Sequence, residues 1–319
     1  MKISASIYSN TAQELSKTIT DLDEHQIDLF HVDCNDDLGV FDDIEVIRKL
    51  SSKPIDLHII TDRPEEYFPY IQKFKVEYVT FQYENLAEKL EVPESITSKL
   101  GLAITSDTDI SVFDSYASRF SFILFMATTP GKSSGVFNKS NFQKIRRFRS
   151  LYPQKNIHVD GGVDGEVSFI LRNMGVYAAV SGSYLFKATT LSSALLNLKS
   201  NEIESHFQVK DFMRPLEETP LLKSSERKFE DVLISIDSYS MAFTILIDDT
   251  GRIEGIISNA DVRKGLIENI SDLNNITVEN IINLNPVSIN ENATVLELLK
   301  HIKSKSFPIT YLPVVNNDN

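Results

Sequence analysis

The sequence predicts an α/β protein in which a (β/α)8 TIM barrel, residues 1–200, precedes a smaller α+β domain, residues 201–319. The first observation is an alternation in the N-terminal part, where eight apolar runs rich in β-branched and aromatic residues alternate with segments of helical periodicity. The second is a change of composition near residue 205. A doubly wound open sheet is the alternative for the first part, but eight regular units favour a closed barrel.

The expected barrel strands are short and rich in Ile, Val, Phe and Tyr. They cover residues 2–9, 27–35, 55–61, 78–84, 101–106, 120–128, 156–162 and 177–186. The helices expected between them include residues 11–26, 63–74 and 138–153. Thr11 followed by Glu14 has the capping-box pattern of a helix start. Pro64 suits the first turn of the next helix, because a first-turn residue needs no backbone N–H.

A connector rich in proline and charged residues, "VKDFMRPLEETPLLKSS" (209–225), follows the barrel. A β–α–β–β–α order comes next, and residues 276–319 repeat its first part. Internal repetition at about 60–70 residues is typical of a tandem module. The second copy stops where its third strand and second helix would come, so we expect a shortened module or a chain that is cut short.

Composition and charge argue against several classes of protein. The net charge of −13 disfavours nucleic-acid binding, and the short basic segment 144–149 is typical of one solvated helix face. Cys34 is the only cysteine, so no intramolecular disulfide can form, which fits a reducing compartment. No stretch of about 18 apolar residues occurs, and the N-terminus lacks the apolar region of a signal peptide. We expect a cytoplasmic protein that binds neither nucleic acid nor membranes.

Polar residues collect at the expected carboxyl ends of the barrel strands, where the active sites of this fold lie. Side chains alternate along a strand, so His31 and Asp33 point to one face and Cys34 to the other, against the helices. His58 and Asp160 hold equivalent places on the third and seventh strands. Two histidines and two aspartates suit one divalent Zn, Fe, Mn or Co ion that keeps positions open for a substrate.

Each of these residues has an ordinary interpretation when taken alone. An H-x-D pair is usually a satisfied polar pair, a lone strand histidine is usually a core residue, "DGG" is most often a turn, and Asp36 can cap the next helix. Their common placement at one end of the barrel favours the metal site. Ser9 ends the first strand, and Gly182 and Ser183 follow the eighth, where this fold commonly binds phosphate.

Residues 1–195 resemble the ribulose-phosphate 3-epimerase family of phosphate-binding barrels. The matching motifs are "ASIYS" (5–9), "HVDCND" (31–36), "DLHIITDRPEEY" (56–67), "FMATTPG" (125–131), "HVDGGV" (158–163) and "VSGSYLF" (180–186). The resemblance implies a metal-dependent epimerase of a ketose phosphate. In it, His31, Asp33, His58 and Asp160 would hold one divalent metal ion. Asp33 and Asp160 would also exchange the C3 proton on opposite faces of the substrate, through an enediolate. We expect the sugar phosphate to contact Ser9, Met126, Gly161, Gly162, Gly182 and Ser183.

The chain departs from the family motifs in the expected pocket wall. Gln82 stands where the family has histidine, and Thr105-Ser106 where it has Asn-Pro. The glycine-rich loop after the sixth strand reads "PGKSSGVF" (130–137), in which Lys132 is either a phosphate contact or a solvated side chain. We therefore expect an epimerase with a different substrate or with weakened catalysis. The alternatives are a catalytically impaired barrel that binds sugar phosphates or scaffolds partner enzymes, and an aldose–ketose isomerase.

Residues 209–319 resemble a tandem pair of cystathionine-β-synthase-type (CBS) regulatory repeats, with "GIISNADVRKGL" (255–266) as the specific motif. This form is similar to the regulatory tails of arabinose-5-phosphate isomerases and some sugar nucleotidyltransferases, which suggests carbohydrate or surface-polysaccharide metabolism. Ser258 and Asp261 suit an N-cap and a first-turn acid. The resemblance implies that they also bind an adenine nucleotide or a nucleotide sugar. The alternative for the tail is dimerisation or partner docking, and we expect a homo-oligomer.

Overall fold

The computed structural model of the chain describes residues 1–128, 135–200 and 206–317. The chain divides into two units, Met1–Glu204 and Ser205–Asn319. Lys132, for which the sequence left two interpretations open, lies outside the described residues.

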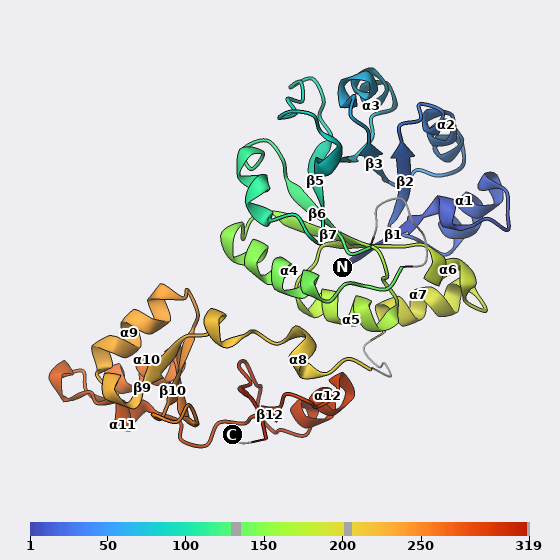
Figure 1. The fold of residues 1–319 in the computed structure, drawn as a ribbon. Helices are drawn as coiled ribbons and strands as arrows, with labels where there is room; N and C mark the ends of the chain where they lie inside the picture. Colours follow the sequence, from blue (N-terminus) through green and yellow to red (C-terminus); the bar gives the residue numbers. More distant parts are fainter. Residues whose placement is uncertain (129–134, 201–205, 318–319) are drawn as a thin grey trace. The chain divides into compact units, whose positions relative to one another are not determined.

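Eight parallel strands of the first unit close into a barrel in the order β1 to β8 (Figure 1). The pairing of β1 with β8 completes the ring. The strands are β1 (Lys2–Ser6), β2 (Leu29–Asn35), β3 (Ile55–Ile60), β4 (Tyr78–Gln82), β5 (Lys99–Thr105), β6 (Phe122–Met126), β7 (Asn156–Asp160) and β8 (Ala178–Ser181). The predicted TIM barrel is confirmed, and each expected strand overlaps an observed one.

Helices surround the barrel less regularly than the sequence suggested. They are α1 (Leu15–Glu24), α2 (Val40–Leu50), α3 (Phe68–Phe74), α4 (Ser140–Leu151), α5 (Gly165–Asn173), α6 (Ser183–Lys187) and α7 (Leu191–Lys199). A 3-10 turn at Pro64–Tyr67 leads into α3, so the proline does open this helical segment. Between β4 and β6, a stretch that is fully described, the only helical segments are the short 3-10 helices Tyr83–Asn85 and Ile110–Ser115, which lie on either side of β5.

The predicted capping box at Thr11 is wrong. Helix α1 begins at Leu15, and no side chain caps its start. The side chain of Asn10 organises the preceding turn instead, because its Oδ1 accepts from the N–H of Ala12 and its Nδ2 donates to Thr18 Oγ1 at 2.9 Å. These local bonds move the helix start to a position after Glu14.

The barrel interior is filled by side chains from alternate strands. The group nearest the amino ends of the strands is a cluster from the even strands, Leu29, Tyr78, Phe122 and Ala178. Above it, the odd strands contribute the inward-facing residues Ser4, Asp56, Gly101 and His158. Gly101 makes room for an aromatic ring, since a Cβ there would lie 2.2 Å from Phe122. Bulky apolar residues are usual at this depth of a barrel, so the polar character of the second group needs an explanation.

The second unit repeats one supersecondary order. A three-stranded sheet in the order β11-β10-β9 comes first, and the two-stranded sheet of β12 and β13 follows. The elements are α8 (Val209–Phe212), β9 (Leu221–Lys223), α9 (Phe229–Ser238), β10 (Phe243–Ile247), β11 (Ile253–Ser258), α10 (Asn259–Glu268), α11 (Val278–Ile281), β12 (Ile289–Asn290), α12 (Val295–Lys303) and β13 (Val314–Val315). In both copies the strands that flank the first long helix pair in parallel, β9 with β10 and β12 with β13.

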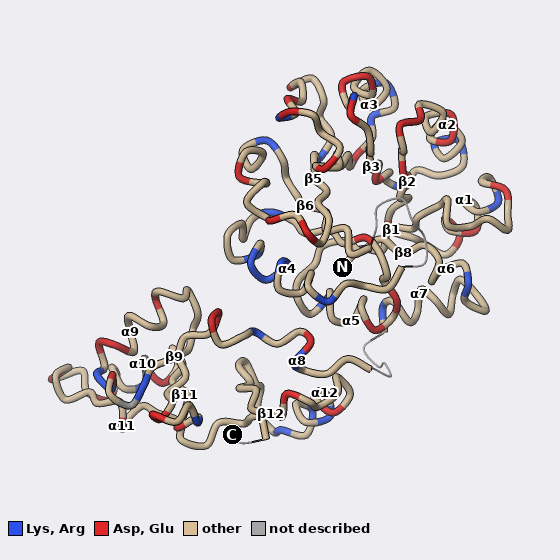
Figure 2. The backbone as a smooth tube through the Cα atoms, viewed as in Figure 1, with Lys and Arg blue, Asp and Glu red and all other residues tan. Residues whose placement is uncertain are grey.

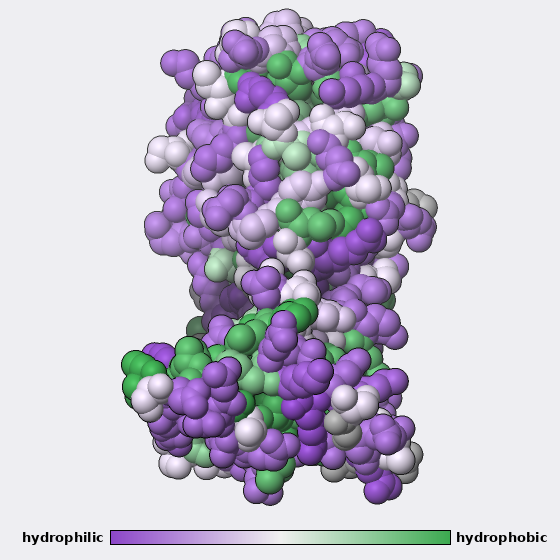
Figure 3. Space-filling view, turned by 90° about the vertical axis from the view of Figure 1, so that its left-hand side faces the viewer, coloured by the Kyte–Doolittle hydropathy of each residue, from purple (hydrophilic) through white to green (hydrophobic). Residues whose placement is uncertain are grey.

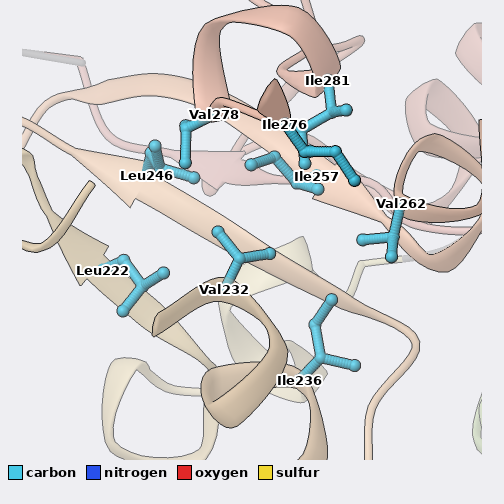
Figure 4. Close-up of a cluster of buried hydrophobic side chains, with 9 residues drawn as sticks. All are labelled: Leu222, Val232, Ile236, Leu246, Ile257, Val262, Ile276, Val278 and Ile281. Atoms are coloured by element: carbon cyan, nitrogen blue, oxygen red, sulfur yellow. The ribbon is translucent and has the colours of Figure 1, made fainter. Parts of the chain in front are cut away.

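An apolar core between the first sheet and its helices holds the second unit together. Val232 and Ile236 of α9 and Val262 of α10 pack with strand residues such as Leu246 and Ile257 (Figure 4). Burying a side chain of this kind contributes roughly 1.5–3 kcal/mol. The motif around Ser258 is therefore anchored on a packed scaffold rather than on a loop.

Charged residues of both signs are interspersed over both units (Figure 2). Hydrophilic residues dominate the face of the molecule seen in Figure 3, with separate apolar patches between them. In the ranges that the structure describes, no helix has the length and apolar character needed to cross a bilayer.

Candidate active site

Four side chains of metal-ligating type converge near the carboxyl ends of β2, β3 and β7. His31 and Asp33 come from β2, His58 from β3 and Asp160 from the last position of β7. Each offers one ligand atom, and the four atoms lie within 4.8 Å of one another. The structure thus brings together all four residues that the sequence singled out as metal ligands.

His31 is fully buried and lies between carboxylates. Its Nδ1 lies 3.0 Å from Asp56 Oδ2, and its Nε2 lies 3.2 Å from Asp33 Oδ1 and 3.9 Å from Asp160 Oδ2. Burial by itself lowers the pKa of His31, but the charges of Asp33 and Asp56 outweigh burial and hold the pKa well above its usual value. The centre of the site therefore favours positive charge.

The two carboxyl groups beside His31 differ in proton affinity. Burial raises the pKa of Asp160 to about 6. Burial acts in the same direction on Asp33, but the charge and hydrogen bond of His31 outweigh it and hold the pKa of Asp33 far below its usual value. Both side chains keep some exposure, 19% for Asp33 and 18% for Asp160. Two reachable carboxyl groups whose pKa values are pushed apart suit a reaction that removes one proton and returns another.

His58 presents a free nitrogen to the same centre. Its Nε2 lies 2.9 Å from Gln82 Oε1, whereas its Nδ1 lies 3.4 Å from Asp33 Oδ1. This Nδ1 is buried and makes no hydrogen bond within the described part of the chain. A buried imidazole nitrogen without a partner that faces carboxylate oxygens is what a metal ligand requires. The two nitrogen and two oxygen donors fit one divalent ion with positions left for a substrate.

Two residues that the sequence analysis left without a role contact these histidines. Asp56 accepts from His31 and, at 2.9 Å, from Ser4 Oγ. Gln82 is 1% exposed and contacts His58. Asp56 lies two residues before His58 on the same strand, so alternation alone places it on the interior face. Gln82 stood out only as a departure from a family motif, and nothing in the sequence predicted its contact with His58.

The expected phosphate contacts lie around the ends of β7 and β8. Gly161 and Gly162 have positive φ angles of 105° and 66°, a conformation that glycine adopts without strain. A Cβ on Gly162 would lie 2.3 Å from the backbone nitrogen of Phe137. Gly182 packs as closely, with its Cβ position 2.1 Å from Ser9 Oγ, and Ser183 begins α6. At Gly162 and Gly182 the space that a Cβ would fill is thus taken by Phe137 and Ser9, so only glycine fits at these two positions.

Met126 and Cys34 occupy different environments. Met126, the remaining expected substrate contact, is 2% exposed and packs inside the barrel with Ala103 and Leu124. Cys34 is buried on the opposite face of β2 from Asp33, and its Sγ donates to the carbonyl oxygen of Asp37 at 3.3 Å. It is not among the residues that converge on the site.

In the second unit, Ser258 and Asp261 form a complete capping box at the start of α10. Asp261 Oδ2 accepts from the backbone N–H of Ser258 at 2.8 Å and from its hydroxyl at 2.6 Å. A separate cavity of about 610 Å³ opens in this unit, lined mainly by aliphatic side chains such as Ile245 and Leu298. Neither Ser258 nor Asp261 belongs to its lining.

A closed parallel barrel with a histidine–aspartate centre at its strand ends defines the class of this protein, a TIM barrel with a group of side chains that could hold a metal ion. Comparison with known proteins then gives the family. The model of the ribulose-phosphate 3-epimerase family matches residues 2–186 of the 319, and the chain belongs to that family. The expected enzyme class, an isomerase of the carbohydrate-epimerase kind, is confirmed by this membership. A CBS-domain model matches residues 278–319, within the predicted CBS pair.

Curated relatives match over the barrel. Ribulose-phosphate 3-epimerase of Bacillus subtilis is 22% identical over 216 residues, covering 63% of this chain and 100% of the relative. The enzyme of the same name from Buchnera aphidicola is 28% identical over 202 residues, covering 58% and 89%. That from Methanocaldococcus jannaschii is 25% identical over 245 residues, covering 72% and 99%.

Proposed function

We propose that this protein is a metal-dependent epimerase that inverts C3 of a ketose phosphate. The observation that carries the proposal is the convergence of His31, Asp33, His58 and Asp160 within 4.8 Å, at the barrel end where this fold performs catalysis. The residues that would hold the divalent ion are these four, whose nitrogen and carboxylate donors suit Zn, Fe, Mn or Co. We assign catalysis to residues 1–200 and regulation to residues 201–319.

Asp33 and Asp160 would perform the two proton transfers. One carboxylate removes the C3 proton, which leaves an enediolate, and the other carboxyl group returns a proton to the opposite face of C3. No atom is gained or lost, and the product differs from the substrate only in the configuration at C3. A divalent ion held by these four residues would supply positive charge that favours the enediolate. The different pKa values of the two acids support this assignment.

The phosphate of the substrate would bind at the ends of β7 and β8. Gly161, Gly162, Gly182 and Ser183 would donate backbone N–H groups to it, because glycine lets the backbone approach an anion closely. Ser9 and Met126 would line the sugar-binding space. The relatives' printed name, ribulose-phosphate 3-epimerase, makes a pentulose phosphate the first substrate to examine.

The decisive experiment is solvent-deuterium incorporation into a panel of pentulose and hexulose phosphates. We expect label at C3 of at least one of them, followed by the C3 epimer. Label at C1 instead would indicate an aldose–ketose isomerase, which uses the same kind of enediolate. The absence of any exchange, together with measurable binding of a sugar phosphate, would favour the second candidate, an impaired barrel that binds ligands or scaffolds partners. The altered residues Gln82 and Thr105 in the expected pocket wall are the observation behind that candidate.

For the second unit, we propose a regulatory site for an adenine nucleotide or a nucleotide sugar at Ser258 and Asp261. The hydrogen bonds of the capping box use Asp261 Oδ2, so Oδ1 can accept from a ribose hydroxyl without breaking the helix start. The link to surface-polysaccharide metabolism, the homo-oligomeric state and the cytoplasmic location stay predictions.

A further inference from the structure

We propose that Gln82 is a positioning residue that fixes the tautomer of His58, so that His58 presents Nδ1 and not Nε2 to the metal. This inference rests on the proposed metal site and specifies how the protein prepares one of its ligands. A chain of hydrogen bonds runs inward from the carboxylate of Glu84 through Gln82 to His58.

The outer end of this chain of hydrogen bonds is Glu84. Its Oε1 accepts from the backbone N–H of Thr105 at 2.8 Å and from the Thr105 hydroxyl at 3.0 Å, and also from the hydroxyl of Thr108. Its Oε2 lies 2.5 Å from Gln82 Nε2. Burial raises the pKa of Glu84, but these hydrogen bonds outweigh burial and hold the pKa below its usual value. Glu84 is therefore an ionised group that only accepts hydrogen bonds.

The orientation of the Gln82 amide follows from Glu84. A carboxylate cannot donate, so the NH2 end of the amide must face Glu84, and the carbonyl oxygen must face His58. Gln82 Oε1 lies 2.9 Å from His58 Nε2 and can only accept, so this nitrogen carries the hydrogen.

The tautomer of His58 follows in turn. In a neutral imidazole with its hydrogen on Nε2, Nδ1 carries a lone pair. That Nδ1 is buried, without a hydrogen-bond partner in the part of the chain that is described, and lies 3.4 Å from Asp33 Oδ1. A lone pair and a carboxylate oxygen facing each other in a buried site repel unless a cation lies between them. The hydrogen-bond chain thus prepares the site for a cation.

His31 is oriented by a second set of hydrogen bonds, in which a carboxylate and not an amide contacts the imidazole. Asp56 accepts from His31 Nδ1 at 3.0 Å, so His31 is directed to present Nε2 to the site. The two histidines consequently offer different nitrogens, one supported by a buried carboxylate and the other by an amide. Gln82 and Thr105, two departures from the family motifs, also belong to one hydrogen-bonded unit through Glu84.

The first test needs no metal. Nitrogen-15 NMR of the histidine side chains distinguishes the two tautomers, and the wild-type protein should show His58 with its hydrogen on Nε2. The variant Gln82→Met keeps a side chain of similar length but can neither accept from His58 nor donate to Glu84, so the preference should be lost. His58 with its hydrogen on Nδ1 in the wild type would overturn the proposal, whatever the protein's activity.

The second test measures affinity for Zn²⁺ or Co²⁺ with a competing chelator, on protein stripped of metal. Loss of a group that orients a metal ligand typically weakens binding about 10–100-fold, and Gln82→Met should fall in this range with an altered Co²⁺ absorption spectrum. The matched control is Thr80→Val, which changes a buried residue of the same strand whose hydroxyl has no partner among the described residues. Its affinity and spectrum should equal those of the wild type.

The outcomes separate this inference from the proposed function. If the wild type binds neither ion, the metal site is wrong, and the NMR result still decides the tautomer. If Gln82→Met binds both ions with wild-type affinity and an unchanged spectrum, Gln82 does not position His58. If Gln82→Met does not fold, Glu84→Gln replaces it as the variant. It removes the charge that orients the amide and should also weaken metal binding and alter the spectrum. A wild-type metal affinity together with a wild-type Co²⁺ spectrum in Glu84→Gln would overturn the inference.

Discussion

The buried side chain of His158 should make the barrel unit lose stability as the pH falls below 6.5. His158 is 1% exposed, and neither ring nitrogen has a hydrogen-bond partner within the described residues. Its ring stacks on Phe122 with centroids 4.1 Å apart and on Tyr177 at 5.5 Å. Burial lowers the pKa of His158 to about 4, against an opposing effect of Asp56 and with further lowering by His31, Lys2 and Lys99.

The size of the effect follows from this pKa. The unfolded chain binds a proton on this histidine near pH 6.5, whereas the folded chain binds it only near pH 4. Stability therefore rises with pH between these values and is unaffected by His158 above pH 6.5. The full loss below pH 4 is about 3 kcal/mol, of which about 2 kcal/mol is lost by pH 5.

The perturbation is His158→Phe, which keeps an aromatic ring in the stack and removes the titrating group. Urea unfolding at pH 7.5 and pH 5, followed by the near-ultraviolet circular dichroism of the tyrosines, gives the free energy of unfolding of the barrel unit. The wild type should lose about 2 kcal/mol more than the variant between the two pH values. The control, His25→Phe, changes an exposed histidine at the end of α1 and should keep the wild-type dependence. Equal losses in wild type and His158→Phe would refute the reasoning.

Four further predictions concern the two sites. Protein purified without chelator should contain about one divalent ion per chain, and elemental analysis of His31→Ala and His58→Ala should show its loss. Asp33→Asn and Asp160→Asn should each lower the rate of C3 epimerisation at least ~10²-fold, so near-normal turnover in either variant would exclude the two-acid mechanism. An unphosphorylated ketose should react far more slowly than its phosphate in a direct kinetic comparison, and equal rates would mean that phosphate is not bound. Calorimetry should detect an adenine nucleotide or a nucleotide sugar binding to the wild type but not to Asp261→Ala, and no binding at millimolar concentration would favour a docking role for the second unit.

The sequence was sufficient to predict what depends on local periodicity. The period of two along each strand placed His31 and Asp33 on the inner face and Cys34 on the outer face, and the structure has them there. The same rule places Asp56 on the inner face, but the sequence of one strand does not predict that Asp56 contacts His31 on the neighbouring strand. The contact of Gln82 with His58 of β3 and the bonds of Glu84 to the end of β5 join neighbouring strands, and no single-strand pattern contains them.

Helix starts were less predictable because competing local hydrogen bonds have similar energies. Thr11 and Glu14 have the spacing of a capping box, but Asn10 forms its own turn and α1 begins later. Ser258 and Asp261 have the same spacing and do form the box. There the preceding strand, β11, ends at Ser258 and fixes the chain direction, so the cap has no competing turn. Tertiary context, which the motif does not encode, decides between the two outcomes.

The polar group of residues inside the barrel is explained by the site above it. Asp56 lies where bulky apolar side chains usually fill this fold, and its burial costs free energy that such a side chain would instead contribute. In this position Asp56 orients the ring of His31, because its Oδ2 accepts hydrogen bonds from both Ser4 and His31. A ring that is already oriented would lose little entropy on binding a cation, so its orientation by Asp56 would favour binding at the proposed site. A bound ion also stabilises the folded chain by mass action, about 2.7 kcal/mol at a concentration of 100 Kd, which is comparable to the cost of one buried, incompletely satisfied polar group. In the proposed metal site, binding of an ion would therefore stabilise the barrel, and Asp56 and His31 would couple the two.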